Sequence, residues 1–190
     1  AEAEVLAKVV GGKSIDLHID LGTGTGTMLE LLAPLSKAAI GIDMSREMLR
    51  VARARLGAPG LAHCQVRQGD LLRLELVDGS ADLVSLHHVL HFLDDPSAAI
   101  REAVRTLRPA GRLLIVDFAP HSLEALRTTY FHRYLGFDHA DIAAWCKAAG
   151  LDRLTQHPVT DESRPDALDT RIWCATRLAG GPDVRHLDAA

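Results

Sequence analysis

Three glycines at alternate positions constrain what this chain can fold into. Gly22, Gly24 and Gly26 directly follow an apolar-rich segment over residues 15–21, and a helix-like pattern of apolar residues begins at Met28. Glycine reaches positive φ at little cost and carries no Cβ, so such a turn lets backbone approach a ligand closely. Strand, glycine turn and helix in this order predict an α/β fold that binds a nucleotide-like molecule.

A carboxylate stands where a ribose would need one. The apolar segment over residues 38–43 ends in Asp43, at the offset of about 20 residues from the first glycine that is typical of ribose-binding acids. A carboxylate can accept hydrogen bonds from both vicinal hydroxyls of a ribose, and such charge-assisted bonds are strong. The alternative is that Asp43 only helps to cap the helix that Ser45 opens.

A second acid occurs in Gly69-Asp70-Leu71, after a strand-like segment over residues 61–66. Its carboxylate could accept a hydrogen bond from the exocyclic amine of an adenine. It could equally cap the N-terminus of a helix, since aspartate is favoured there. The residues alone leave both interpretations open.

The remaining pattern continues the alternation of strands and helices. Residues 81–86, 112–118, 151–159 and 170–177 read as strands, and the last two form a terminal pair. One helix is predicted to begin at Pro96 and to be stopped by Pro109 and Gly111. Another is predicted from Asp138 to Gly150. The chain is therefore expected to build one α/β domain.

These motifs, taken in order, resemble the class I S-adenosylmethionine-dependent methyltransferases over roughly residues 14–177. The resemblance rests on five features: residues 20–26, Asp43, Gly69-Asp70, the strand at Asp82, and residues 107–111. Ala110 stands where that family often has glycine, a small departure. The resemblance implies a Rossmann-like, seven-stranded, mostly parallel sheet with an antiparallel last strand and helices on both faces. Within the class, the chain is similar to the quinone-biosynthesis-like branch (methyltransferase type 11).

The resemblance also implies which residues hold the cofactor, S-adenosyl-L-methionine. The glycine turn would cradle its methionine and adenosine parts, Asp20 would orient the amino group, and Asp43 would take the ribose hydroxyls. Met44, Asp70 and Leu71 would meet the adenine, and residues after the fourth strand would lie near the sulfonium. The cofactor-binding residues implied are Asp20, Gly22, Thr23, Gly24, Gly26, Asp43, Met44, Gly69, Asp70, Leu71, Leu86 and His87.

Histidines gather just beyond the fourth strand, at His87, His88 and His91. Imidazole titrates near neutrality, so His88 and His91 are the candidate catalytic residues, as a base that takes a proton from the acceptor. The other interpretations are a polar rim of the site and a metal pair. Because two histidines show no third ligand in the sequence, no metal site is predicted.

The acceptor side is expected over residues 119–137. All eight aromatic residues lie beyond residue 91, and several follow the fifth strand. Residues 123–134 read as a lid or wall over the carboxyl edge of the sheet, where α/β enzymes bind ligands. The alternative, which ordinary packing of aromatics favours, is that Leu126, Tyr130 and Tyr134 form a buried stripe.

Composition limits the domain count, compartment and partners. The 190 residues predict a single domain over residues 1–178 and a flexible tail over residues 179–190. A net charge of −4 argues against direct nucleic-acid contact by this domain. No apolar run is long enough to span a membrane. Three cysteines with no paired spacing predict a reducing, cytoplasmic setting and no disulfide framework.

Other classes of function and a further domain stay open. Residues 117–121 and 133–137 resemble bacterial proteins in which such a domain follows an ArsR-like DNA-binding domain. The chain does not begin with Met, so a lost or fused N-terminal domain and a homodimer are expected from that resemblance. The main prediction is methyl transfer to a small-molecule acceptor. The alternatives are a module that senses S-adenosylmethionine or S-adenosylhomocysteine for a transcriptional regulator, and a nicotinamide oxidoreductase.

Overall fold

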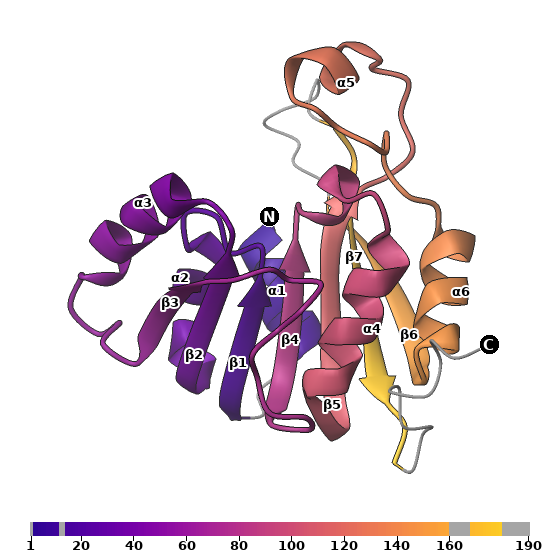
Figure 1. Ribbon diagram of the computed structural model, residues 1–190. Helices are drawn as coiled ribbons and strands as arrows, with labels where there is room; N and C mark the ends of the chain where they lie inside the picture. The colour runs from indigo at the N-terminus through magenta and orange to yellow at the C-terminus, as the bar shows by residue number, and fades with distance from the viewer. Residues whose placement is uncertain (1, 12–13, 160–167, 180–190) are drawn as a thin grey trace.

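The computed structural model describes residues 2–11, 14–159 and 168–179. Strands and helices alternate along most of the chain (Figure 1). The elements are α1 (Glu2–Val10), β1 (Ile15–Leu21), α2 (Thr27–Leu32), the 3₁₀ turn η1 (Ala33–Leu35), β2 (Ser36–Asp43), α3 (Arg46–Leu56), β3 (Cys64–Gln68), β4 (Ala81–His87), the 3₁₀ turn η2 (Leu90–Phe92), α4 (Pro96–Thr106), β5 (Leu107–Phe118), α5 (Ala125–Thr129), α6 (His139–Ala148), β6 (Leu151–Val159) and β7 (Thr170–Arg177).

The seven strands form one sheet in the order β3-β2-β1-β4-β5-β7-β6. The pairs from β3 to β5 are parallel, whereas β7 runs antiparallel to both of its neighbours. This confirms the predicted mostly parallel sheet with an antiparallel last strand. The strand order reverses direction between β1 and β4, and open α/β sheets bind ligands at such a switch point, beyond the carboxyl ends of the strands.

Helices cover both faces of the sheet. Helices α4 and α6 lie in front of it in Figure 1, and their residues Ile100 and Ile142 are fully buried in the largest hydrophobic cluster. Helices α1 and α2 lie on the other face, where Leu6 and Met28 pack against β5 and β7. Both faces of the central strands are therefore buried, which fits their nearly continuous apolar sequences.

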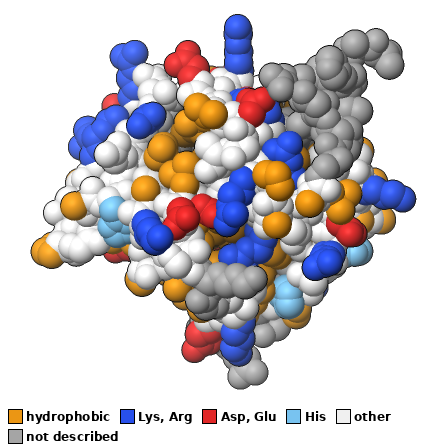
Figure 2. Space-filling view, turned by 90° about the horizontal axis from the view of Figure 1, so that it is seen from below, with side chains coloured by type: hydrophobic (Ala, Val, Ile, Leu, Met, Phe, Trp, Pro, Cys, Tyr) orange, Lys and Arg blue, Asp and Glu red, His pale blue; other side chains and the backbone are white. Residues whose placement is uncertain are grey.

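The lower end of the sheet carries no predicted site residue. Lys37 at the start of β2 pairs with Asp16 of β1 at 2.7 Å. Arg108 pairs with Asp82 nearby. Seen from below, basic side chains lie next to acidic ones at this end (Figure 2). The site must therefore be sought at the upper, carboxyl end.

Several predicted boundaries were wrong. The third strand begins at Cys64, not at residue 61, and no helix follows Asp70 among the described residues up to β4. Helix α4 ends at Thr106, before Pro109, and β5 begins at Leu107 because this residue is extended and pairs with Ala81. Local propensity did not show this pairing, which joins segments far apart in sequence.

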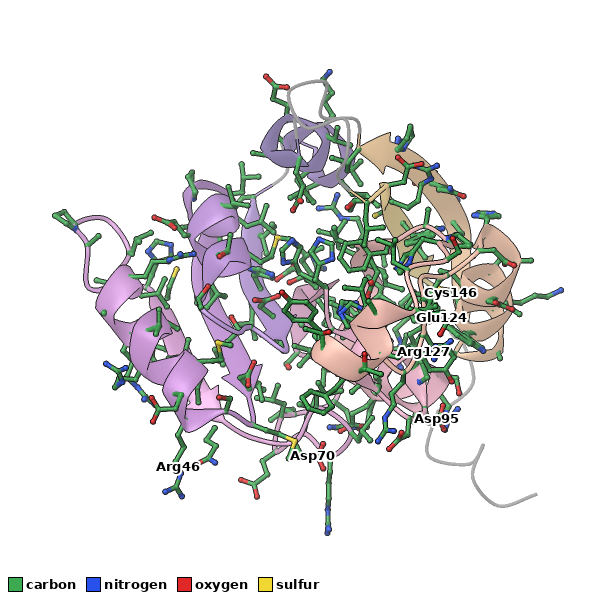
Figure 3. All side chains as sticks on the ribbon, turned by 90° about the horizontal axis from the view of Figure 1, so that it is seen from above. Arg46, Asp70, Asp95, Glu124, Arg127 and Cys146 are labelled. Carbon is green, nitrogen blue, oxygen red and sulfur yellow. The ribbon has the colours of Figure 1, made fainter. Side chains whose placement is uncertain are left out.

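The segment over residues 119–137 stands above the carboxyl edge of the sheet. It contains the short helix α5, which projects beyond the strands in Figure 1. Tyr130 is 60% exposed and Phe131 is 77% exposed, so the expected buried stripe through Tyr130 is wrong. From above, Glu124, which precedes α5, and Arg127 of α5 lie over the body of the domain (Figure 3), and they pair at 3.1 Å.

The remaining predictions about the chain concern its ends and its surroundings. The predicted flexible tail lies, from residue 180 on, outside the described residues. Within the described ranges, no helix has both the length and the apolar character needed to cross a membrane.

Candidate functional site

The glycine turn follows β1 at the switch point of the sheet. Gly22 and Gly24 have φ values of 71° and 52°, a region that glycine enters most easily. A Cβ on Gly22 would also collide with the side chain of Val89. The N–H groups of Gly22 and Thr23 donate to the carbonyl of Ile42 at 2.8 and 3.0 Å. The turn is thus anchored to β2, and only glycine fits at its first position.

Asp43 joins the glycine turn to the end of β2. Its Oδ2 accepts from the N–H of Gly24 and its Oδ1 from the N–H of Ser45, both at 2.8 Å. The two backbone bonds fix the orientation of the carboxylate. Each oxygen keeps a free lone pair, so Asp43 can accept two further hydrogen bonds from a diol. Ser45 itself caps α3 by accepting from the N–H of Met48.

These residues line one cavity of about 530 Å³. Its floor is the glycine turn, and its sides come from the loops after β2 and β4 and from Leu71. Apolar surface predominates among the lining atoms, with a few polar groups at fixed places, as in most small-molecule sites. The lining residues are Gly22, Thr23, Gly24, Thr25, Thr27, Asp43, Met44, Ser45, Met48, Leu71, His87, His88, Val89 and Phe92.

Buried polar atoms with few partners lie beneath the turn. Asp20 is 1% exposed, and its Oδ1 accepts from the hydroxyl of Ser85 at 2.6 Å. Its Oδ2 and the Oγ1 of Thr23 have no hydrogen-bond partner beyond each other. Buried polar groups are almost always paired, so these two oxygens fit a ligand that supplies a donor, such as an amino group.

A buried histidine supports Asp20 from below. The hydroxyl of Ser85 donates its only proton to Asp20. Its Oγ must therefore accept from the Nε2–H of His18, 2.7 Å away. Burial lowers the pKa of His18 to about 3, and the ring is therefore neutral. Burial also raises the pKa of Asp20 against the lowering effect of its hydrogen bonds.

Some predicted site residues lie outside the cavity. Gly26 starts α2, and a Cβ there would meet Ala52 of α3 at 3.3 Å, so its small size serves helix packing. Leu86 is fully buried in the core. Gly69 and Asp70 line a neighbouring cavity instead.

Asp70 stands at the outer margin of the upper face in Figure 3. Its Oδ1 accepts from the N–H of Leu72 at 2.9 Å. This is a turn stabilised by an aspartate side chain, not a helix cap. No described residue donates to its other oxygen, which stays available to a ligand that reaches across from the main cavity.

Sequence reasoning missed six lining residues: Thr25, Thr27, Ser45, Met48, Val89 and Phe92. Thr25 and Thr27 follow the glycines directly and could have been included on that ground. Met48 and Val89 could not, because their exposure to the cavity depends on how α3 and β4 pack beside the turn.

The histidines after β4 differ in environment. His87 Nε2 lies 2.8 Å from a carboxylate oxygen of Glu2. Burial is the largest single influence and acts against the charged imidazole, but the bond to Glu2 and the negative charges of Glu2, Asp20 and Asp117 together leave the pKa of His87 raised. Burial lowers the pKa of His88 to about 4. His88 also has a φ of 49°, and such backbone strain in a non-glycine residue clusters at functional sites.

His91 does not line the cavity. It is 2% exposed, and its Nδ1 lies 2.7 Å from Oδ1 of Asp117, a fully buried residue of β5. The rings of Phe92 and His132 pack against it at centroid distances of 4.1 and 4.2 Å. Of the two predicted catalytic residues, His88 thus faces the cavity and His91 lies one layer behind it. Sequence reasoning missed Asp117.

Comparison with known proteins agrees with this geometry. A family model described as a methyltransferase domain matches residues 19–115, about half of the chain. The chain therefore belongs to the methyltransferase domain family. More particularly, it belongs to the quinone-biosynthesis-like branch of the class I S-adenosylmethionine-dependent methyltransferase family.

Two relatives illustrate the match. The chain is 41% identical over 105 residues to an uncharacterised 37.1 kDa protein in a transposon of Streptomyces fradiae, covering 55% of this chain and 30% of that protein. It is 33% identical over 124 residues to the demethylmenaquinone methyltransferase of Thermus thermophilus, covering 63% and 56%. The chain thus spans about a third of the first of these relatives and somewhat over half of the second.

Solved structures share the fold. The YcgJ protein of Bacillus subtilis superposes with a TM-score of 0.76 at 19% identity, covering 94% of this chain and 98% of that one. A phosphoethanolamine N-methyltransferase from Haemonchus contortus in complex with S-adenosyl-L-methionine gives 0.76 at 16% identity, covering 93% and 52%. At these identities the likeness concerns the fold alone.

Proposed function

We propose that this domain transfers a methyl group from S-adenosylmethionine to a small-molecule acceptor. The observation that carries the proposal is the single cavity in which Asp43 and the glycine turn face His88. Asp43 and the glycine turn form a site for an adenosine-like ligand. His88 stands at the side of the cavity from which an acceptor would approach.

The chain's own residues account for each part of the cofactor. Asp43 would accept from the two ribose hydroxyls with its free lone pairs. Met44, which is 66% exposed, and Leu71 would pack against the adenine, and Asp70 would reach its edge. The Oδ2 of Asp20 and the Oγ1 of Thr23 would accept from the amino group, directly or through a water.

When bound, S-adenosylmethionine supplies an electrophilic methyl group on its sulfonium. The contribution of the chain is to hold the acceptor in line with that methyl group and to keep water away. Val89 and Phe92 would close the cavity beside the methyl group. His88 would contact the acceptor. His91, the other candidate catalytic histidine, lies one layer behind His88 and would not touch the acceptor.

An arsenic acceptor is not favoured. One relative, 38% identical over 109 residues, is an arsenite methyltransferase from Aquipseudomonas alcaligenes. Arsenite is captured by thiolates, but Cys64, Cys146 and Cys174 lie in three different hydrophobic clusters. Burial raises the pKa of Cys146 to about 12. An acceptor with oxygen, carbon or nitrogen at the reacting position fits the histidine-lined wall better.

A transfer assay tests this function. The domain would be incubated with S-adenosylmethionine labelled in its methyl group and with panels of phenols, amines and carbon acids. We expect label in at least one acceptor, and a strong loss of transfer in His88→Ala, while His139→Ala, which alters an exposed histidine at the start of α6, retains it. Tight cofactor binding without any transfer would favour the sensing module instead.

A further inference from the structure

The wall behind the cofactor cavity holds a buried group of metal-binding side chains. His88, His91 and Asp117 each offer one ligand atom, and these atoms all lie within 4.8 Å of one another. The strand register explains the meeting: His87 of β4 pairs with Val116 of β5, which brings the next residues, His88 and Asp117, side by side. His91 follows on the turn η2.

This group leaves ligand atoms without partners. Asp117 is fully buried, yet its Oδ2 accepts no hydrogen bond. The Nδ1 of His88 is also buried and unpaired. So is the Nδ1 of His132, an 8% exposed residue whose ring packs against His91. Orphaned polar atoms in a native interior call for an explanation, and an ion is one of the few available.

A hydrogen-bonded pair alone explains less. Asp117 could simply orient His91 through their 2.7 Å contact. That arrangement uses one oxygen of the carboxylate and leaves its Oδ2 and the Nδ1 of His88 unsatisfied in a dry environment, which is unfavourable for buried polar groups. A cation held by His88, His91 and Asp117 accounts for both of these atoms.

We propose that His88, His91 and Asp117 bind one divalent transition-metal ion. Two imidazoles and one carboxylate are a ligand set with open positions that suits such ions. The ring of His132 packs against His91 at a centroid distance of 4.2 Å. Sequence reasoning predicted no metal because it found no third ligand, and the pairing of β4 with β5 supplies it.

A second group of ligand atoms is less suited to bind an ion. Glu2, His87 and His88 also lie within reach of one another. There, however, the His87 Nε2 and Glu2 already satisfy each other at 2.8 Å, and all three residues are only partly buried. No partnerless carboxylate remains in that group, so the ion belongs with Asp117.

The ion would lie beside the methyl-transfer region, because His88 lines the cofactor cavity. With one carboxylate, the site keeps a net positive charge. It would therefore stabilise the anion that an acceptor hydroxyl leaves when its proton passes to water. This use of the ion rests on the proposed function, whereas its binding does not.

Titration with Co²⁺ tests the site without any cofactor. Chelator-treated protein would be titrated while the visible absorption of bound Co²⁺ is recorded. We expect one ion per chain and binding weakened at least about tenfold by His88→Ala, His91→Ala or Asp117→Asn. The controls His139→Ala and Glu2→Gln should bind as the wild type does, and circular dichroism checks that every variant is folded.

Two results would overturn the proposal. One is the absence of saturable Co²⁺ binding by the folded wild type. The other is binding that persists in His88→Ala, which alters a partly exposed position and spares the core. Asp43→Ala should keep Co²⁺ binding, and His91→Ala and Asp117→Asn, which alter residues outside the cofactor cavity, should keep S-adenosylmethionine binding, so failure of this proposal and failure of the methyltransferase function are distinguishable.

Discussion

The two halves of the carboxyl edge are built differently. On the β1–β2 side, the backbone N–H groups of Gly24 and Ser45 fix the carboxylate of Asp43 beside the glycine turn. On the β4–β5 side, His88, His91 and Asp117 come from separate segments and leave ligand atoms unpaired. The first half is preorganised for one ligand, whereas the second depends on something the chain does not itself supply.

The largest effect is expected from Gly22→Ala. The new Cβ would collide with Val89 and force a positive φ on alanine. Cofactor affinity should fall by about two orders of magnitude, a loss of roughly 3 kcal/mol, measured by calorimetry. Gly60→Ala is the matched control, because Gly60 has a φ of 87° but open space around it. If both variants bind equally well, the close approach to Val89 is irrelevant.

Low pH should lower the free energy of unfolding, because His18 is buried as a neutral ring beneath the glycine turn. Since the pKa of His18 is about 3 when folded and 6.5 in its ordinary range, the unfolded chain binds more protons between these values. The stability that the neutral ring allows is complete above pH 6.5 and is lost as pH falls towards 3. The loss is about 2 kcal/mol at pH 5.

Urea unfolding at pH 7.5 and pH 5 measures this dependence. His18→Gln keeps a donor for Ser85 and cannot titrate, so its stability should fall less between the two pH values. Asp20, whose raised pKa acts in the opposite direction, is present in both proteins and cancels in the difference. Equal slopes for the two proteins would show that His18 does not titrate on unfolding.

A smaller effect is expected from Asp70→Ala. The carboxylate is exposed and already accepts from Leu72, so a further bond to adenine would contribute about 1 kcal/mol. Affinity for S-adenosylmethionine should fall about fivefold. No change would remove Asp70 from the cofactor site. A loss as large as that of Asp43→Ala would mean that the two neighbouring cavities act as one.

The difference between the halves also decides what could be predicted. Asp43 and the glycines were found because their roles depend on sequence spacing, whereas the seven-stranded sheet was implied by the resemblance to the class I methyltransferases. Asp117 was missed because its contact with His91 spans 26 positions and requires the register of β4 and β5. The sequence left open whether Asp70 caps a helix, and the structure shows a turn in which its side chain accepts from the N–H of Leu72 instead.

The most direct test of the account is calorimetric titration of S-adenosylmethionine and S-adenosylhomocysteine into wild type, Asp43→Ala and Asp16→Ala. Asp16 carries an exposed carboxylate at the opposite end of β1. We predict that wild type and Asp16→Ala bind both ligands alike and that Asp43→Ala loses about 10- to 100-fold in affinity, as expected for one or two charge-assisted bonds. Well-folded wild-type protein that binds neither ligand would contradict the account, as would an Asp43→Ala variant that binds like the wild type.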